Sequence, residues 1–525
     1  MHTRFVEHTL PNGLRVVCEA MPRVSSAAVA MFVRTGSRHE RPGEHGVSHF
    51  LEHMCFKGSH RRSCREINVR FDELGSIYNA FTGKEHTVYY GWVPADRVEP
   101  QLDLLADLVR PALPAADFET ERKVILEEIA MGDDAFERHV SNYLHHVIFE
   151  GHPLAHEILG DRETIATLPR ERMAAYARER YAADNITLVA TGAIDPQSVF
   201  AWAARQCGHW QRADADCITP HSATDPALPA AASALHSRRN GPASRNGSPP
   251  RAGASAARAT GATDACTIGT PGVCTIGAPD GLAALATPGV VAAVGSSGIA
   301  PGSAPTDSQP NDDVESSFAA GRDRVLSAPA RRVFPPPPPI PRSGARSLRL
   351  PQFTQQEVML VYPGPASGAP EEEDIETFAS LFGGHNSRCY WNIVQRGVAA
   401  GAGAAWLAYG GCGAIVLWAT GDPDKSKEML SALRREARRV MRDGFTASEV
   451  QRVRNQRRMQ LALEGESPRT RVMQIIDDLE TRNAPRTVGH CIAAVEQVTR
   501  ESVQRSLRKW PIDGEGLLVT VGPRG

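Results

Sequence analysis

The chain has 525 residues, a formal net charge of −2 and a sequence pI near 6.8. This length is too great for one ordinary hydrophobic core and predicts two or three domains. The nearly balanced charge gives no global basic field, so nucleic acid is not an expected partner, and no apolar run approaches the length of a membrane span.

The spacing of the cysteines and the N-terminal sequence indicate the cellular compartment. Ten cysteines are scattered along the chain without a CxxC pair or the dense spacing of a disulfide-rich secreted domain. The opening MHTRFVEHTLPNGLRVV has neither the apolar core of a signal peptide nor the arginine-rich pattern of a transit peptide. Both observations predict a cytoplasmic protein.

Residues 1–210 form the first predicted domain. Strand-like stretches at 14–18, 27–33 and 87–93 alternate with amphipathic helical patterns. This mixture predicts an α+β domain.

Residues 211–345 have a different composition, rich in Ala, Pro, Gly and Ser, with too few branched and aromatic residues to offset the entropy of ordering. We predict a disordered linker there. Periodic patterns return in 346–525, with a strand-like stretch near Ser347, helical patterns at 372–382 and 425–441, and a helix followed by a strand in 498–521. The prediction is therefore two similar α+β domains joined by a long linker, although no internal repeat is visible by eye.

The segment GEHGVSHFLEHMCFKGS, residues 43–59, contains the pattern H-x-x-E-H. On a helix, its apolar residues lie on one side, and His49, Glu52 and His53 lie on the other. Two imidazoles at positions i and i+4 can bind one tetrahedral ion with a carboxylate beside it. Chance supplies about 0.04 such patterns in a chain of this composition, so the pattern favours a zinc site over a solvated polar helix face.

A catalytic zinc ion needs a third protein ligand and an open position for water. The helix predicted over 117–134 carries Glu121 and Glu128, which are seven residues apart and share a face. Glu127 projects about 120° away from Glu121 on the same helix. For any one of these glutamates alone, a charged helix face in solvent is the alternative.

These motifs occur together with further matching stretches: TLPNGLRVV, NAFTGKEHTVYY at 79–90, ERKVILEEI at 121–129, FEGHPLAHEILG at 149–160 and, more loosely, FGGHNSRCY at 382–390. The chain thus resembles the pitrilysin–insulinase family of inverted-motif zinc peptidases, in particular the group that contains mitochondrial processing peptidase and its bacterial relatives. The resemblance covers nearly everything except the predicted linker.

The resemblance implies one zinc ion per chain, bound by His49, His53 and Glu128, with Glu52 as the general base. It implies that Glu121 orients a ligand from outside the metal's coordination sphere. The strand that would pair with an extended peptide substrate comprises Asn79, Ala80, Phe81 and Thr82. The resemblance further implies that both halves have one common fold and close around a chamber.

The second half of the sequence departs from the family pattern at one place. Fully equipped members of the family carry an arginine and, seven residues later, a tyrosine after an SR dipeptide. Here Gln395 and Ala402 stand in those places, and Arg396 and Tyr409 are nearby at the wrong spacing. A partner chain would have to supply the missing contacts, so a homodimer or a heterodimer with a related subunit is expected.

The other histidines are not expected to bind a second metal. His145, His146, His152 and His156 cluster around the HPL stretch, which is a structural loop in the related sequences, and His39, His45 and His60 are expected at the surface. The predicted function is that of a zinc endopeptidase acting on peptides or extended protein segments. The alternative is a non-catalytic or partner-dependent peptide-binding subunit, which the intact H-x-x-E-H motif disfavours.

Overall fold

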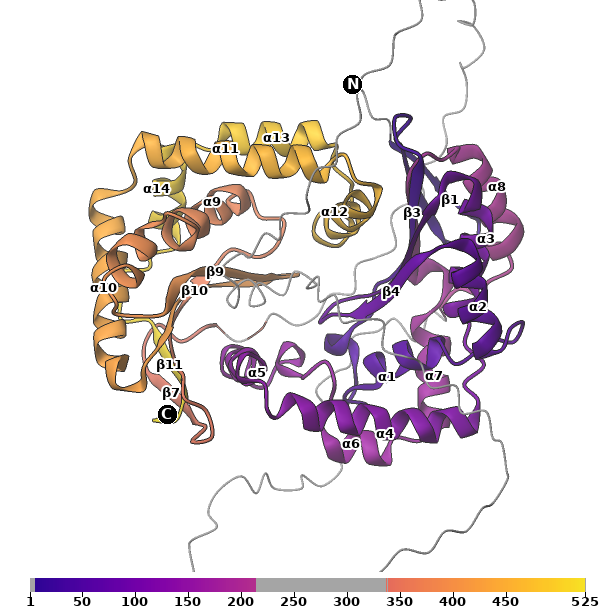
Figure 1. Cartoon of the computed structure of the whole chain (residues 1–525), viewed down its shortest axis with the longest axis horizontal. Coiled ribbons are helices and arrows are strands. Elements are labelled where there is room, and N and C mark those ends of the chain that lie inside the picture. The colour runs from indigo at the N-terminus through magenta and orange to yellow at the C-terminus, as the bar shows by residue number, and fades with distance from the viewer. Residues whose placement is uncertain (1–4, 214–336, 338, 525) are drawn as a thin grey trace, which may run out of the picture.

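The computed structural model describes residues 5–213, 337 and 339–524. Most of the predicted linker lies outside the described residues, so its disorder and the predicted domain boundaries stay predictions. The described residues form two halves, each a β-sheet with helices packed on it, as predicted (Figure 1).

The first half follows the predicted mixture of strands and helices. The predicted strands at 14–18, 27–33 and 87–93 are found as β2, β3 and β5, and the helix predicted over 117–134 is α4. The elements are β1 (Phe5–Thr9), β2 (Arg15–Ala20), β3 (Ser26–Val33), α1 (Val47–Cys55), α2 (Cys64–Leu74), β4 (Ile77–Thr82), β5 (Thr87–Pro94), α3 (Val98–Leu108), α4 (Ala115–Gly132), α5 (Phe136–Ile148), α6 (Arg162–Thr167), α7 (Arg170–Arg180), β6 (Ile186–Gly192) and α8 (Pro196–Cys207), with short 3₁₀ turns between some of them.

The second half differs from the prediction at its start. The single strand-like stretch near Ser347 forms two strands, because the chain turns at Pro351. The elements are β7 (Ala345–Arg349), β8 (Gln356–Gly364), α9 (Glu372–Gly383), the π-helical turn η7 (Tyr390–Val394), β9 (Gly401–Tyr409), β10 (Cys412–Gly421), α10 (Ser426–Asp443), α11 (Ala447–Glu464), α12 (Pro468–Thr481), α13 (Val488–Gln497), α14 (Arg500–Lys509) and β11 (Leu517–Gly522).

The two sheets have the same topology. The first has the order β1-β2-β6-β3-β5-β4, and the second has the order β7-β11-β8-β10-β9. In each sheet one parallel pair, β2 with β6 or β7 with β11, is followed by antiparallel pairs only. Without β1, the first sheet therefore matches the second strand for strand, which is the internal similarity that the sequence does not display.

One helix of each half packs on the sheet of the other half. Alternate residues of β3 face opposite sides, and the side with Ala28, Ala30 and Phe32 is covered by α12 of the second half. This double coverage explains why β3 reads as a continuous apolar run. Helix α5 of the first half packs its apolar side on the strands of the second sheet (Figure 1). Residues of both halves therefore belong to one buried hydrophobic cluster.

A buried ion pair crosses the same contact. Arg471 on α12 donates from Nε to Oε2 of Glu19 at 2.8 Å, and each side chain is only 1% exposed. A second donor of Arg471 reaches the backbone oxygen of Arg486 at 3.0 Å. A charge buried to this extent requires a partner, so the pair fixes how α12 lies on the first sheet.

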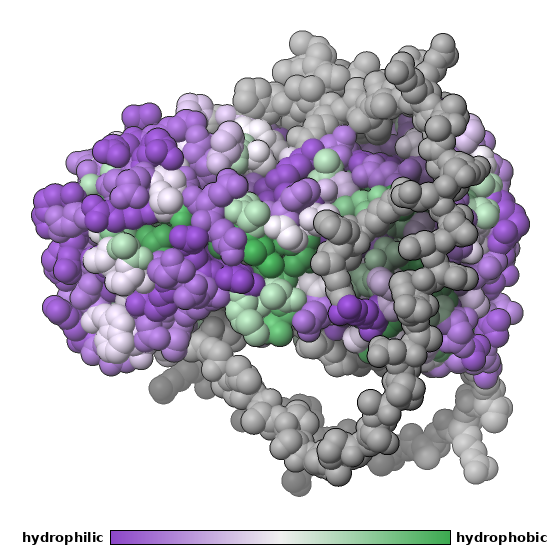
Figure 2. Space-filling view, turned by 90° about the horizontal axis from the view of Figure 1, so that it is seen from above, coloured by the Kyte–Doolittle hydropathy of each residue, from purple (hydrophilic) through white to green (hydrophobic). Residues whose placement is uncertain are grey.

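Hydrophilic residues cover most of the outer surface seen from above, and hydrophobic ones gather near the middle of this view (Figure 2). Across the described ranges, none of the helices is long and apolar enough to cross a membrane.

Candidate active site

Helix α1 carries the H-x-x-E-H motif and is held by its apolar side. Phe50 is fully buried and stacks on Phe118 of α4, with 4.7 Å between ring centres. The helix starts after Gly46, whose φ of +88° suits glycine and whose added Cβ would lie 2.5 Å from a backbone oxygen. The motif's polar side is not solvated, because His49 and Glu52 are each 9% exposed. The alternative of a solvated polar face was therefore wrong.

Three potential ligand atoms converge beside this helix. Oε2 of Glu128 lies 3.8 Å from Nε2 of His49 and 3.9 Å from Nε2 of His53. The ligand atoms of these three residues all lie within 4.8 Å of one another. The Glu128 Oε2 atom is buried and has no hydrogen-bond partner among the described residues. A buried carboxylate oxygen directed at two imidazoles without a hydrogen bond has the chemistry of a cation site.

Glu121 links His53 to a lysine that the sequence reasoning missed. Its Oε1 lies 2.9 Å from His53 Nδ1, and its Oε2 lies 2.6 Å from Nζ of Lys57. Glu121 and Lys57 are 5% and 8% exposed as side chains, so this contact is shielded from water. Lys57 lies in the turn just after α1, so its sequence position alone did not place it beside Glu121.

The two histidines differ in their surroundings. Nδ1 of His49 is buried without a partner among the described residues, whereas Nδ1 of His53 meets Glu121. Burial lowers the pKa of His49 well below its ordinary value, and the neighbouring His53 adds to this. Burial also acts to lower the pKa of His53, but the hydrogen bond with Glu121 and nearby carboxylates outweigh it and raise that pKa. Only His53 has the outer partner that orients metal-binding imidazoles.

Glu52 is positioned by a residue of the predicted substrate strand. Thr82, at the end of β4, donates from Oγ1 to Glu52 Oε2 at 2.6 Å. Burial raises the pKa of Glu52, and His53 and the Thr82 hydroxyl oppose that rise. Thr82 therefore contacts the candidate base with its side chain, which its place in the motif did not predict.

The other predicted substrate-strand residues also lie on β4, at the edge of the first sheet. Among the strands that the structure describes, β4 pairs with β5 alone. Asn79 is exposed and its Oδ1 accepts from the backbone N–H of Ala80 at 2.9 Å, and Phe81 is partly buried. The outer edge of β4 thus provides a backbone that no other described strand covers.

Residues 395–409, where the sequence departs from the family pattern, include side chains that contact other residues of this chain. Gln395 donates to the hydroxyl of Tyr390 at 2.6 Å, Ala402 is buried in β9, and Arg396 is exposed. The hydroxyl of Tyr409 lies 2.7 Å from Nε2 of His145, in the contact between the halves. Tyr409 is thereby engaged by α5 of the first half.

Several other histidines have protein partners. Nδ1 of His152 accepts from the backbone of Leu154, and His156 stacks near His45, with 4.2 Å between ring centres. His45 also pairs with Asp161 at 3.5 Å. Of the three histidines predicted at the surface, His60 is exposed, and His39 and His45 are partly exposed. His146 is also exposed.

Comparison with known families gives a match in both halves. Residues 15–162 match the profile described as insulinase (peptidase family M16), and residues 167–244 and 311–457 match the peptidase M16 inactive domain. The chain belongs to peptidase family M16. The first match contains α1 and α4, the two helices that carry the converging histidines and glutamates.

Relatives of this M16 chain include proteins named as zinc proteases. It is 38% identical over 192 residues to the mitochondrial-processing peptidase subunit beta of Lentinula edodes, covering 36% of this chain and 41% of that one. It is 39% identical over 188 residues to an uncharacterized zinc protease of Bacillus subtilis, covering 36% and 46%. An uncharacterized zinc protease of Rickettsia bellii is 36% identical over 206 residues, covering 39% and 50%. The M16 chain thus spans half or less of the length of these relatives.

Solved structures share the whole fold of the M16 chain. A protease from Helicobacter pylori superposes with a TM-score of 0.72 at 15% identity, covering 99% of this chain and 100% of that one. A peptidase M16 inactive domain from Pseudomonas fluorescens gives a TM-score of 0.69 at 14% identity, covering 99% and 98%. These likenesses establish the two-domain arrangement of sheets and helices.

Proposed function

We propose that the chain is a zinc-dependent endopeptidase that cleaves peptides or extended protein segments between its two halves. The observation that carries the proposal is the convergence of His49, His53 and Glu128, with Glu52 on the same helix as the histidines. The relatives named as zinc proteases support the same activity class.

The geometry fits one zinc ion per chain. Bonds of about 2.0–2.2 Å to a tetrahedral zinc ion place two ligand atoms about 3.3–3.6 Å apart. The distances of 3.8 and 3.9 Å from Glu128 Oε2 to the two imidazoles need only a small adjustment. Two imidazoles and one carboxylate also leave a fourth position open, as in catalytic zinc sites.

Zinc, when bound, supplies Lewis acidity that polarises a peptide carbonyl and acidifies water. Glu52 would accept the proton of the attacking water and later deliver it to the leaving amine. The Thr82 hydroxyl holds one oxygen of Glu52 in place. Glu121 accepts from His53 and is itself held by Lys57, so the carboxylate and the imidazole cannot turn independently.

The substrate would bind as an additional strand on the free edge of β4. An extended peptide can pair its backbone with an uncovered strand, and this mode suits many sequences because backbone groups supply the hydrogen bonds. The exposed Ile77 at the start of β4, 54% exposed, and Asn79 would meet side chains of that peptide. We infer a peptide ligand class but no single cleavage preference.

A second proposal concerns assembly. Gln395 and Ala402 stand where an arginine and a tyrosine are expected, Arg396 is exposed, and Tyr409 is engaged by His145. A homodimer, or a heterodimer with a related subunit, would supply the missing substrate contacts, and one relative is named as a subunit of a processing peptidase.

The test compares the native protein with Glu52→Gln. Both should bind about one zinc ion per chain, because Glu52 is not a ligand in this proposal, and only the native protein should cleave a quenched fluorescent peptide. Chelation followed by zinc replacement should abolish and restore cleavage. A Glu52→Gln variant that keeps most of its activity would overturn the assignment of the base, and a native protein that binds peptide without cleaving it would favour the partner-dependent subunit.

A further inference from the structure

A cavity lies in the first half, and its lining contains none of the histidines of α1. It has a volume of about 500 Å³ and lies where the ends of α3, α7 and α8 meet the segment after α1. This volume lies in the range of small-molecule sites, which is roughly 300–1,000 Å³. None of the residues proposed for peptide cleavage lines this cavity.

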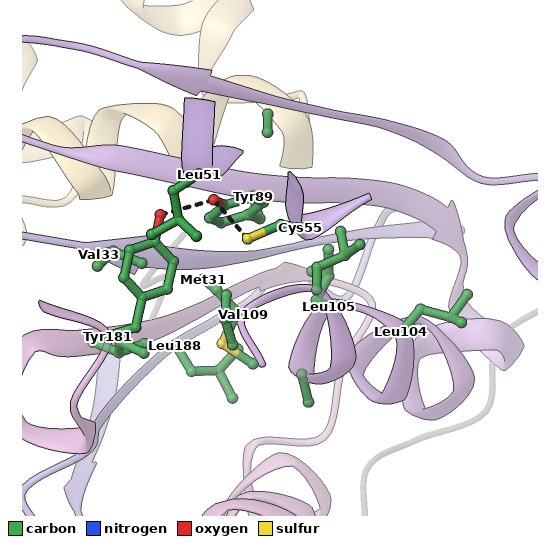
Figure 3. Packing of buried hydrophobic residues seen from close by; sticks show 14 of the residues in the cluster. Met31, Val33, Leu51, Cys55, Tyr89, Leu104, Leu105, Val109, Tyr181 and Leu188 are labelled. Atoms are coloured by element: carbon green, nitrogen blue, oxygen red, sulfur yellow. Dashed lines mark hydrogen bonds between the residues drawn. The ribbon is translucent and has the colours of Figure 1, made fainter. Parts of the chain in front are cut away.

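The floor of the cavity is apolar because its polar atoms point elsewhere. Val109 and Tyr181 line it and also belong to the main core of the first half. The hydroxyl of Tyr181 lies 2.8 Å from that of Tyr89, which donates to Sγ of Cys55 at 3.2 Å (Figure 3). The Tyr181 hydroxyl is thus satisfied inside the protein, and Tyr181 contributes mainly its ring to the cavity.

One wall carries the guanidinium group of Arg110. Cζ of Arg110 lies 3.7 Å from the ring centre of Trp210, and both residues line the cavity. Nη1 of Arg110 donates to the backbone oxygens of Val109 and Tyr181 at 2.7 and 2.9 Å. Within residues 5–213 and 339–524, no carboxylate forms an ion pair with Arg110. Burial lowers the pKa of Arg110 to about 10, because removing the charged group from water costs free energy. A bound anion would offset that free-energy cost.

The rim adds a second guanidinium group. Arg178 is exposed and lines the cavity, together with the exposed imidazoles of His60 and His209. Asp107 is the one acidic residue among the described residues of the lining, and it already pairs with Arg62 and with Arg61. The cavity therefore combines an apolar floor, an aromatic face and an excess of cationic groups.

We propose that this cavity binds a small organic anion, one with a flat apolar body and a carboxylate group. The apolar body would lie on the floor beside Trp210, and the carboxylate would meet Arg110 and Arg178. Guanidinium groups bind carboxylates with paired hydrogen bonds and also stack on aromatic rings, which suits both contacts. Ligand binding to this cavity can be measured whether or not the chain cleaves peptides, so the two proposals are tested separately.

The test is calorimetric titration of the full chain with 1-naphthoate and with 1-naphthylmethylammonium, which share a ring system and differ in charge. We expect saturable one-to-one binding of 1-naphthoate and none of the cation. Arg178→Glu should weaken naphthoate binding by about tenfold, since it reverses a charge at the rim, whereas Arg65→Glu, an exposed arginine on the neighbouring α2, should leave it unchanged. A second variant, Ala177→Phe, should fill the cavity and abolish binding.

Three results would overturn the proposal. The first is the absence of saturable naphthoate binding, and the second is equal binding of the cationic compound. The third is an equal loss in Arg65→Glu and Arg178→Glu, which would mean that only the general charge of the surface matters. The exposed arginine variants decide the question even if Ala177→Phe does not fold.

Discussion

Replacement of Glu128 by Gln tests which of two adjacent glutamates belongs to the metal site. Glu128 points its Oε2 at both imidazoles, at 3.8 and 3.9 Å, whereas the neighbouring Glu127 is exposed. Loss of an outer partner of a metal ligand typically lowers metal affinity 10–100-fold. Loss of a ligand should cost more, so we expect Glu128→Gln to weaken zinc binding more than about 100-fold, or about 2.7 kcal/mol.

Glu127→Gln is the matched control, because it makes the same chemical change one residue away. We expect its zinc affinity to be unchanged and its stability to change by no more than about 0.5 kcal/mol. Zinc affinity would be measured by competition with a chelator of known affinity, with circular dichroism confirming that both variants fold. The reverse order, a strong loss in Glu127→Gln and none in Glu128→Gln, would refute the placement of α4 beside the histidines.

Three further predictions concern the contacts that join or stabilise the halves. Arg471→Met should lower the free energy of unfolding by about 3–5 kcal/mol, since it leaves Glu19 buried without its cation, and adding Glu19→Gln in the same chain should recover part of that loss in a denaturant titration. Burial raises the pKa of Glu357 to about 8, so the folded chain keeps a proton that the unfolded chain releases near pH 4.5. The free energy of unfolding should therefore fall as the pH rises from about 4.5 to 8. Glu357→Gln should flatten this part of a profile of melting temperature against pH. Tyr409→Phe removes the hydrogen-bond partner of Nε2 of buried His145 and should lower the free energy of unfolding by about 1–3 kcal/mol. An unchanged melting temperature would show that this bond does not stabilise the contact between the halves.

Elements with a local signal in the sequence could be predicted without the structure. The apolar side of α1 and the two histidines four residues apart follow from helical periodicity alone, and the spacing of Glu121 and Glu128 follows from the same rule. The strands β2, β3 and β5 were predicted nearly to their ends because runs of branched and apolar residues mark them. The candidate ligands and base were therefore accessible from sequence, together with the family resemblance.

Contacts between residues far apart in the sequence became visible in the folded chain alone. Thr82 reaches Glu52 from a separate strand, and α12 covers β3 from the other half of the chain. The common topology of the two sheets is likewise invisible in the sequence, because strand order depends on pairing between segments far apart along the chain. Periodicity reports which side of an element is buried but not what covers it, so these contacts follow from long-range packing that no local pattern encodes.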